Sequence, residues 1–119
     1  MTLPPPGTRT RRSEIDELLA ETRHPDAETR RRAIHRLCPC ALRSDDARVW
    51  DRLLEMVTDT DPRVRADVLH TFCDGSPRSR ENQVVGALEG MQHDPDVRLR
   101  RRVRKILAHY RSGGRINIL

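Results

Sequence analysis

Aromatic residues and lysine are scarce in this sequence. Trp50, Phe72 and Tyr110 are single examples of their kinds, and aromatics make up 3% of the chain. Only one of the 23 basic residues is a lysine, Lys105, and all the others are arginine. With so few aromatic rings, the core must be built from aliphatic side chains and alanine, which suits packed amphipathic helices. Stacking of nucleic-acid bases would have few partners.

Cysteine and long apolar runs are also in short supply. Three cysteines, an odd number, favour a reducing cytoplasm over a disulfide framework. No apolar run approaches the roughly 20 residues needed to span a bilayer, and the first twelve residues lack the apolar segment of a signal peptide. We therefore expect a cytoplasmic protein with no membrane partner. At 119 residues it should form one domain with a modest core.

Charge is abundant, and its balance is basic. Charged residues make up 34% of the chain and the net charge is +5. Planar guanidinium groups suit carboxylate and phosphate, so the composition favours acidic partners. A genome-wide codon bias toward arginine would produce the same excess, so the count alone does not establish binding.

The strongest signal is a pattern that returns every 35 residues. The aligned sets are Ala33, Val68 and Val103; Leu37, Phe72 and Leu107; Leu18, Leu53 and Leu88; Asp26, Asp61 and Asp96; and Arg30, Arg65 and Arg100. A fixed period of this length is typical of stacked supersecondary units that cannot bury their apolar faces alone. The sequence therefore predicts three stacked helical units.

Helix signals divide the chain further. We expect a flexible Pro/Arg-rich arm at 1–12, repeat units at about 13–44, 45–78 and 79–110, and a C-terminal tail at 111–119. The expected helices span about 13–22, 25–37, 46–57, 62–72, 80–91 and 95–110, with a loop at 39–45. Pro25 is placed near the start of its helix, where its missing N–H costs nothing. Gly86 and Gly90, one turn apart, suggest a close-packing face.

Both ends of the stack carry charge where interior units are apolar. Glu14 and Glu21 of the first unit align with Val49 and Met56, and with Val84 and Met91. On the opposite flank, Leu19 and Leu54 align with Glu89, and Ile34 and Leu69 align with Arg104. Because terminal repeats need a polar outer face, we expect three repeats to be the whole solenoid, capped at both ends. The protein should then be a monomer by itself.

Three segments carry a family resemblance: HPDAETRRRAIHRL, DTDPRVRADVLHTF and HDPDVRLRRRVRKIL. They resemble the second-helix signature of HEAT repeats, over about residues 13–110. The resemblance implies an all-α fold, a short right-handed α-solenoid of three helical hairpins with six main helices. It also implies that an Asp six residues before each inward arginine pairs across neighbouring units. Asp59 and Asp94 fill that position before Arg65 and Arg100, whereas His24 fills it before Arg30.

Signatures of catalysis are missing. The chain has no glycine-rich phosphate loop, no G-x-S-x-G and no H-E-x-x-H. HEAT-like di-iron hydroxylases depend on His-Glu motifs, and no His-Glu dipeptide occurs here. We expect no enzyme activity, no catalytic residue and no cofactor. The resemblance implies instead a scaffold or adaptor that binds another macromolecule.

A helical wheel places most remaining basic residues on the free face of the second helices, which line the concave surface of HEAT-like solenoids. The predicted partner-binding residues are Arg31, Arg32, His35, Arg36, Arg63, His70, Arg98, Arg101, Arg102 and Lys105. Such a one-signed row favours an acidic protein segment as partner. The alternative is sequence-independent nucleic-acid binding, assisted by Arg9, Arg11 and Arg12 of the arm. A solvated face that only keeps the protein soluble would show the same pattern.

Two smaller features need interpretation. His35 and Cys38 are three residues apart, and so are His70 and Cys73 one repeat later. Two such pairs superficially suggest a tetrahedral zinc site with Cys40 as a spare thiolate, but repeat duplication alone gives this spacing, so no metal is expected. In the tail, Ile116, Ile118 and Leu119 follow a Gly-Gly break. Back-packing over the last helix is favoured over insertion into a partner.

Overall fold

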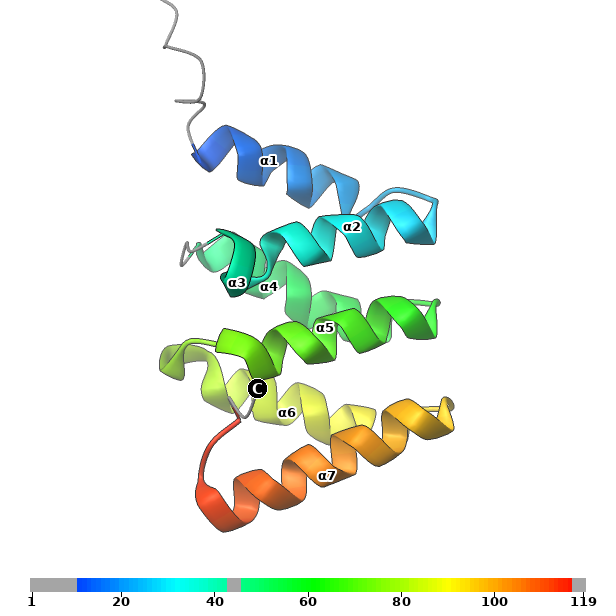
Figure 1. The fold of residues 1–119 in the computed structure, drawn as a ribbon, viewed down its shortest axis with the longest axis vertical. Coiled ribbons are helices and arrows are strands. Elements are labelled where there is room, and N and C mark those ends of the chain that lie inside the picture. The colour runs from blue at the N-terminus through cyan, green and yellow to red at the C-terminus, as the bar shows by residue number, and fades with distance from the viewer. Residues whose placement is uncertain (1–10, 43–45, 117–119) are drawn as a thin grey trace, which may run out of the picture.

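The computed structural model describes residues 11–42 and 46–116, and within these ranges the chain is helical with no strand. Six longer helices form three hairpins that stack one above the next (Figure 1). The hairpins are α1 (Arg11–Glu21) with α2 (Ala27–Leu37), α4 (Ala47–Glu55) with α5 (Pro62–Gly75), and α6 (Glu81–Met91) with α7 (Val97–Gly113). Shorter pieces are α3 (Pro39–Leu42), η1 (Met56–Thr58) and η2 (Arg78–Arg80). The prediction of an all-α, short solenoid of helical hairpins is confirmed.

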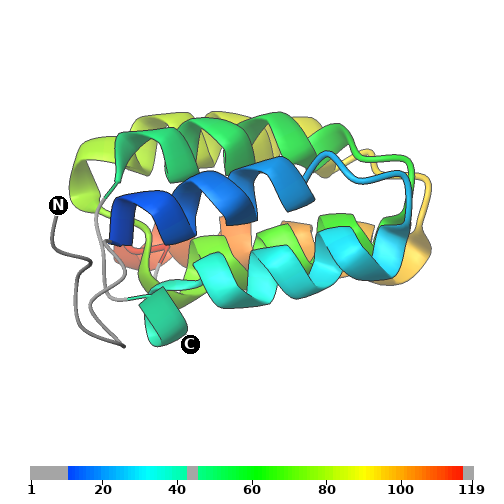
Figure 2. The same cartoon turned by 90° about the horizontal axis from the view of Figure 1, so that it is seen from above.

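The hairpins arrange their helices in two layers. Seen from above the stack, α1, α4 and α6 lie on one side, and α2, α5 and α7 lie on the other (Figure 2). The second helices therefore share one layer, as the predicted partner-binding face requires. Their contacts run in order, α2 against α5 and α5 against α7.

A repeated aspartate begins each second helix. Asp26, Asp61 and Asp96 are the N-caps of α2, α5 and α7, and each side chain accepts a hydrogen bond from a backbone N–H of the first turn. Such caps stabilise a helix by roughly 1 kcal/mol each. Pro62 occupies the first helical turn as expected. Pro25 does not, because it precedes the Asp26 cap, so that predicted boundary was too early.

Other boundaries differ from the sequence prediction by short stretches. Helix α1 begins at Arg11, inside the predicted arm, and the rest of that arm, 1–10, lies outside the described residues. Part of the predicted 39–45 loop forms α3, while 43–45 lie outside the described residues. Helix α5 continues to Gly75, because the turn signal takes effect only at Ser76 and Pro77. There the Gly75 position lies close to Pro39 of α3.

The core is aliphatic, as the scarcity of aromatics predicts, and follows the 35-residue alignment. Fully buried side chains from every hairpin form one cluster, which includes Leu18, Leu53 and Leu88. Trp50 and Phe72 stack within it, with ring centroids 6.5 Å apart. Burying a side chain of this size contributes roughly 1.5–3 kcal/mol, so the interior is the main source of stability.

Burial along the flanks agrees with the predicted polar ends. Met56 and Met91 are buried where one hairpin contacts the hairpin before it, whereas the equivalent Glu21 is exposed. On the other flank Leu69 is buried, and its equivalent Arg104 is exposed on the last helix. The interior positions thus contact neighbours, and their charged equivalents face solvent.

A ladder of arginine–aspartate pairs joins neighbouring hairpins. Arg30 donates two hydrogen bonds to the Asp59 carboxylate, at 3.0 and 2.9 Å, and Arg65 donates two to Asp94, both at 2.9 Å. The second rung is the more buried, with 10% and 5% of its two side chains exposed. Burial alone would raise the pKa of Asp94, but the hydrogen bonds from Arg65 and from the Asp96 N–H outweigh it and leave that pKa lowered. The predicted structural role of this arginine set is confirmed.

The ladder also explains why His24 departs from the pattern. Asp59 and Asp94 each accept a hydrogen bond from the N–H two residues later, and His24 Nδ1 accepts the same bond from Asp26. The histidine thus retains the local role of the aspartate. It lacks the cross-repeat role, since an imidazole is not a carboxylate and no arginine of the described residues donates to the ring.

Gly86 and Gly90 do not form a close-packing face. Both are exposed, and a Cβ built on either would meet nothing within 4 Å. One repeat earlier the same positions hold Asp51 and Glu55, both exposed on α4. The interpretation was wrong because glycine spacing alone does not show which face of a helix is buried.

Candidate partner-binding surface

The predicted partner-binding residues all lie on the layer formed by α2, α5 and α7. Nine of the ten are exposed, and Arg31 is half-buried. The helices that carry them pack directly against one another. The residues therefore share one side of the molecule, but their charges are not equally available.

On α2 and α5, carboxylates neutralise much of the positive charge. Arg31 pairs with Asp67 of the neighbouring helix at 2.8 Å and with Glu28 at 3.0 Å. Hydrogen bonds to these two carboxylates raise the pKa of Arg31. His35 Nε2 lies 3.2 Å from Asp67 as well. Arg31 is thus half-buried in an ion-pair network between the first two hairpins.

Two further cations of this face are also paired. Arg63 contacts Glu28 at 3.0 Å and its own helix cap Asp61 at 2.9 Å. Hydrogen bonds from the side chain and backbone of Arg63 lower the pKa of Asp61 to about 2, so the cap is ionised at neutral pH. Arg36 pairs with Glu14 of α1 at 3.2 Å. Exposed pairs of this kind contribute only about 0–1 kcal/mol each, but they reduce the charge offered to a partner.

The basic residues of α7 are in a different state. Arg98, Arg101, Arg102 and Lys105 are all exposed, and none of them forms an ion pair or a side-chain hydrogen bond in the part of the chain that the structure describes. Their positions on the helix place them along one face. We call these four residues the α7 basic stripe.

Two hollows lie beside the stripe, one on each side of α5. The hollow between α5 and α7, of about 290 Å³, is lined by Pro62, Arg63, Ala66, Asp96, Arg98, Leu99 and Arg102. The hollow between α2 and α5, of about 350 Å³, is lined by His35, Cys38, Ala66, Asp67, His70, Thr71 and Arg102. Ala66 and Arg102 line both. The two hollows are therefore neighbours, separated by Ala66 of α5 and Arg102 of α7.

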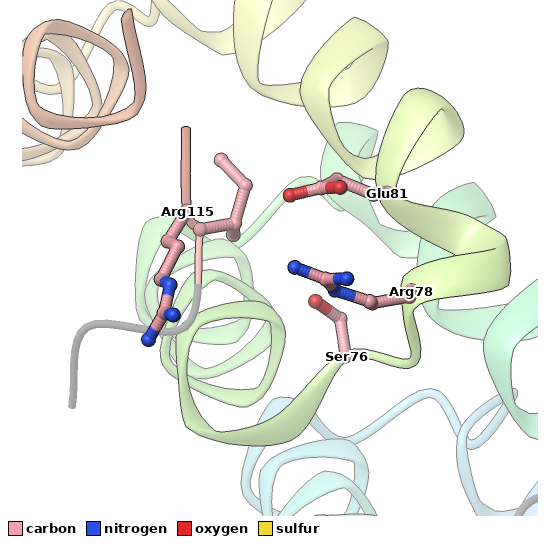
Figure 3. A pocket seen from close by; sticks show the side chains of 5 residues that line it. Ser76, Arg78, Glu81 and Arg115 are labelled. Carbon is pink, nitrogen blue, oxygen red and sulfur yellow. The ribbon is translucent and has the colours of Figure 1, made fainter. Parts of the chain in front are cut away.

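A third hollow, of about 320 Å³, lies at the junction of α5 and α6 and is lined by Ser76, Arg78, Glu81, Arg115 and Ile116 (Figure 3). Ile116 is 1% exposed and belongs to the core cluster, although it follows the end of α7. Gly114, with φ +72°, ends α7 and allows the chain to turn back. Ile116 therefore packs back into the core, as predicted for the tail, but at the junction of α5 and α6, whereas the sequence analysis placed it over the last helix; Ile118 and Leu119 lie outside the described residues.

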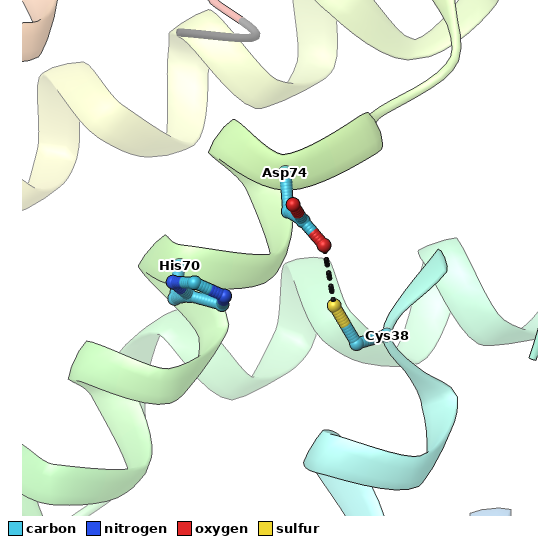
Figure 4. Close-up of side chains that lie close together, drawn as sticks. All are labelled: Cys38, His70 and Asp74. Carbon is cyan, nitrogen blue, oxygen red and sulfur yellow. Dashed lines mark hydrogen bonds between the residues drawn. The ribbon is translucent and has the colours of Figure 1, made fainter. Parts of the chain in front are cut away.

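The two His-x-x-Cys pairs do not come together as one four-ligand group. Cys73 is buried, and burial raises the pKa of its thiol to about 11. Instead, Cys38 lies near His70 and near Asp74, which the sequence reasoning did not consider (Figure 4). The i,i+4 spacing of His70 and Asp74 on one helix was the signal that could have found this group.

A family model described as HEAT repeats matches residues 15–108, and the chain belongs to the HEAT-repeat family. HEAT repeats typically serve as protein–protein interaction scaffolds, and no catalytic family matches. No curated protein and no solved structure matches the chain. Among the described helices, none is long and apolar enough to span a membrane.

Proposed function

We propose that this protein is a non-catalytic HEAT-repeat adaptor that binds an acidic segment of another protein along its second helices. The observation that supports this most is the α7 basic stripe: four exposed cations that form no ion pair or side-chain hydrogen bond among the described residues, two of which, Arg98 and Arg102, line the hollow between α5 and α7. An exposed cation without an internal ion pair breaks no existing contact when it binds a carboxylate. Such charge complementarity also speeds association.

The lining of the α5–α7 hollow narrows the chemistry of the partner. Arg98 and Arg102 offer guanidinium groups in its lining, next to Asp96 and the paired Arg63, while Ala66 and Leu99 offer apolar surface. Guanidinium groups form paired hydrogen bonds with carboxylates. An acidic segment that also carries apolar side chains therefore fits this hollow best.

The test uses a fluorescent peptide rich in Asp and Glu with interspersed Leu as the probe. We expect R101E/R102E/K105E to bind it at least tenfold more weakly than the wild type, with an unchanged circular dichroism spectrum because the three side chains are exposed. The control is R23E/R78E/R111E, which changes the net charge equally at exposed positions outside the predicted face. Binding retained by the first variant, or lost equally by the control, would contradict the proposal.

Sequence-independent nucleic-acid binding is the alternative, and the unpaired cations of α7 favour it equally well. The burial of Trp50 and Phe72 counts against it, since neither ring is available to stack on a base. A shift assay with DNA and RNA over a salt series separates the two. A shift that weakens steeply with salt would favour phosphate binding, and no shift at low salt would eliminate it.

We further propose that the adaptor acts as a monomer in the cytoplasm. The exposed charges Glu21, Glu89 and Arg104 on the two end flanks support this, because stacking a second copy there would bury them without partners. Cys38 and Cys73 are buried and form no disulfide in the described part of the chain, which is consistent with a reducing compartment. Light scattering after size exclusion should give the monomer mass, and a dimer mass would contradict the proposed monomeric state.

A further inference from the structure

Three side chains with metal-binding atoms meet where the first and second hairpins join. Cys38 caps the C-terminal end of α2, and His70 and Asp74 lie one turn apart on α5. One ligand atom from each lies within 4.8 Å of the other two (Figure 4). Cys38 Sγ also donates a hydrogen bond to Asp74 Oδ2 at 3.0 Å. Packing of α2 against α5 therefore produces this group, which no single helix contains.

The three groups match the ligand preferences of zinc. Thiolate, imidazole and carboxylate bind Zn²⁺ at about 2.3, 2.0–2.1 and 2.0–2.2 Å, and tetrahedral geometry then separates the ligand atoms by roughly 3.3–3.6 Å. The separations in the group reach up to 4.8 Å, and the Cys38 Sγ to Asp74 Oδ2 distance is 3.0 Å, so the side chains must adjust slightly to bind an ion. His70 is exposed and can rotate, whereas Cys38 is 3% exposed and held in place.

The surroundings leave room for the fourth position of such a site. Cys38 and His70 both line the hollow between α2 and α5, so a water molecule can reach an ion held between them. Arg102 lines the same hollow, and its positive charge opposes a cation there. Two anionic ligands, the thiolate and the Asp74 carboxylate, offset that repulsion once Cys38 loses its proton to solvent on binding.

We propose that Cys38, His70 and Asp74 bind one divalent transition-metal ion of the zinc class, which links α2 to α5. The ion joins two hairpins that otherwise meet through apolar contacts and ion pairs. Since it binds only the folded chain, it raises the thermal midpoint. His70 is also one of the predicted partner-binding residues, but none of the three ligands belongs to the α7 basic stripe, so the metal titration is done without peptide and tests the site separately from partner binding.

The experiment titrates the reduced, chelator-treated full-length protein with Co²⁺, then displaces it with Zn²⁺. We expect one equivalent of Co²⁺ to produce a thiolate-to-cobalt absorption band in the near ultraviolet, removed by Zn²⁺. Cys38→Ser and His70→Ala should each weaken binding at least tenfold and abolish or reduce the band. Asp74→Asn should weaken binding in the same direction.

The controls keep the result interpretable. Cys38→Ser replaces the thiol with a hydroxyl that can also donate to Asp74, and His70 is exposed, so both variants should keep the wild-type thermal midpoint without metal. Cys73→Ser and Cys40→Ser test the other two thiols and should retain the band. No band in the wild type, as a plain thiol–carboxylate hydrogen bond predicts, would overturn the proposal. A band that survives Cys38→Ser, or that disappears in a Cys73→Ser protein with the wild-type circular dichroism spectrum, would overturn it equally.

Discussion

Two regions of the molecule follow the same repeat pattern but differ in charge. One is the junction between the first and second hairpins, and the other is the last helix, α7. Across the junction, Glu28 and Asp67 pair with the neighbouring arginines. At the repeat-equivalent positions, α7 carries Arg98 in place of Glu28 and Arg102 in place of Asp67. Two acidic-to-basic differences therefore turn a largely neutralised face into an unpaired cationic one. In a repeat protein, function can thus reside in the unit that departs from its neighbours.

The arginine ladder shows the same contrast between interior and end. Arg65 holds both the Asp94 carboxylate and, at 2.7 Å, the Asp59 carbonyl of its own loop. Among the described residues, Arg100 has only the bond to its own loop, to the Asp94 carbonyl at 2.9 Å, and no aspartate pairs with it. The arginines that pair with an aspartate of the next hairpin therefore contribute to stability, and Arg100, which has no such pair among the described residues, contributes little.

The largest effect on stability is expected from breaking the interior ion pair, Arg65–Asp94. Arg65→Ala should destabilise the protein by roughly 3–5 kcal/mol, because it leaves the buried Asp94 carboxylate unpaired. Arg100→Ala, the matched change at the end, should cost less than about 1 kcal/mol. Urea unfolding at pH 7 measures both. Equal losses would contradict the distinction between interior and end.

Lowering the pH tests the same Arg65–Asp94 pair. The pKa of Asp94 is lowered in the folded state, so its contribution is present above about pH 4, the ordinary value for aspartate, and is lost as pH falls through the folded pKa. The stability difference between wild type and Arg65→Ala should therefore shrink below pH 4. A difference that stays constant down to pH 2 would show that lost packing, not the ion pair, causes the effect.

An intermediate effect is expected from exchanging the charges of the two regions. Arg98→Glu with Arg102→Asp gives α7 the carboxylates of the earlier units. We expect acidic-peptide binding at least tenfold weaker, equivalent to about 1.4 kcal/mol, with stability unchanged within about 0.5 kcal/mol. The reverse change, Glu28→Arg, should extend the cationic face and tighten peptide binding several-fold. If neither variant alters peptide affinity, the contrast between the regions has no role in binding.

The smallest effect concerns the first helix of the terminal unit. Gly86 lies in the interior of α6 and Gly90 in its last turn, both with open space around them. Replacing each with alanine should stabilise the protein by about 0.5–1 kcal/mol, because alanine favours the helix. Thermal unfolding measures the shift. Gly114→Ala is the opposite control and should destabilise, since φ is +72° there; a loss at Gly86 or Gly90 would restore the close-packing interpretation.

Local and repeated features were predictable from the sequence. The 35-residue period indicated three stacked hairpins, and the aligned aspartates proved to be the helix caps. The partners of the ladder followed from the family resemblance. These inferences succeed because caps and apolar stripes depend on residues a few positions apart, and because each repeat restates the same pattern.

Predictions about the surface were less complete. Arg31 belongs to the predicted basic row but is half-buried against Asp67, which is 36 positions away in the chain. A helical wheel gives the face of a residue, not its distance from a carboxylate on the next helix. For the same reason the sequence did not associate Cys38 with Asp74. The assignment of partner-binding residues remains a prediction that the proposed variants test.

By itself, the sequence determined the class of fold, the number of hairpins and the polar ends, because each depends on periodicity and on which positions are apolar. Only the tertiary structure decided which cations are neutralised and which remain unpaired on α7. It also decided which thiol meets an imidazole and a carboxylate. These outcomes depend on distances between side chains of different helices, and packing geometry sets those distances.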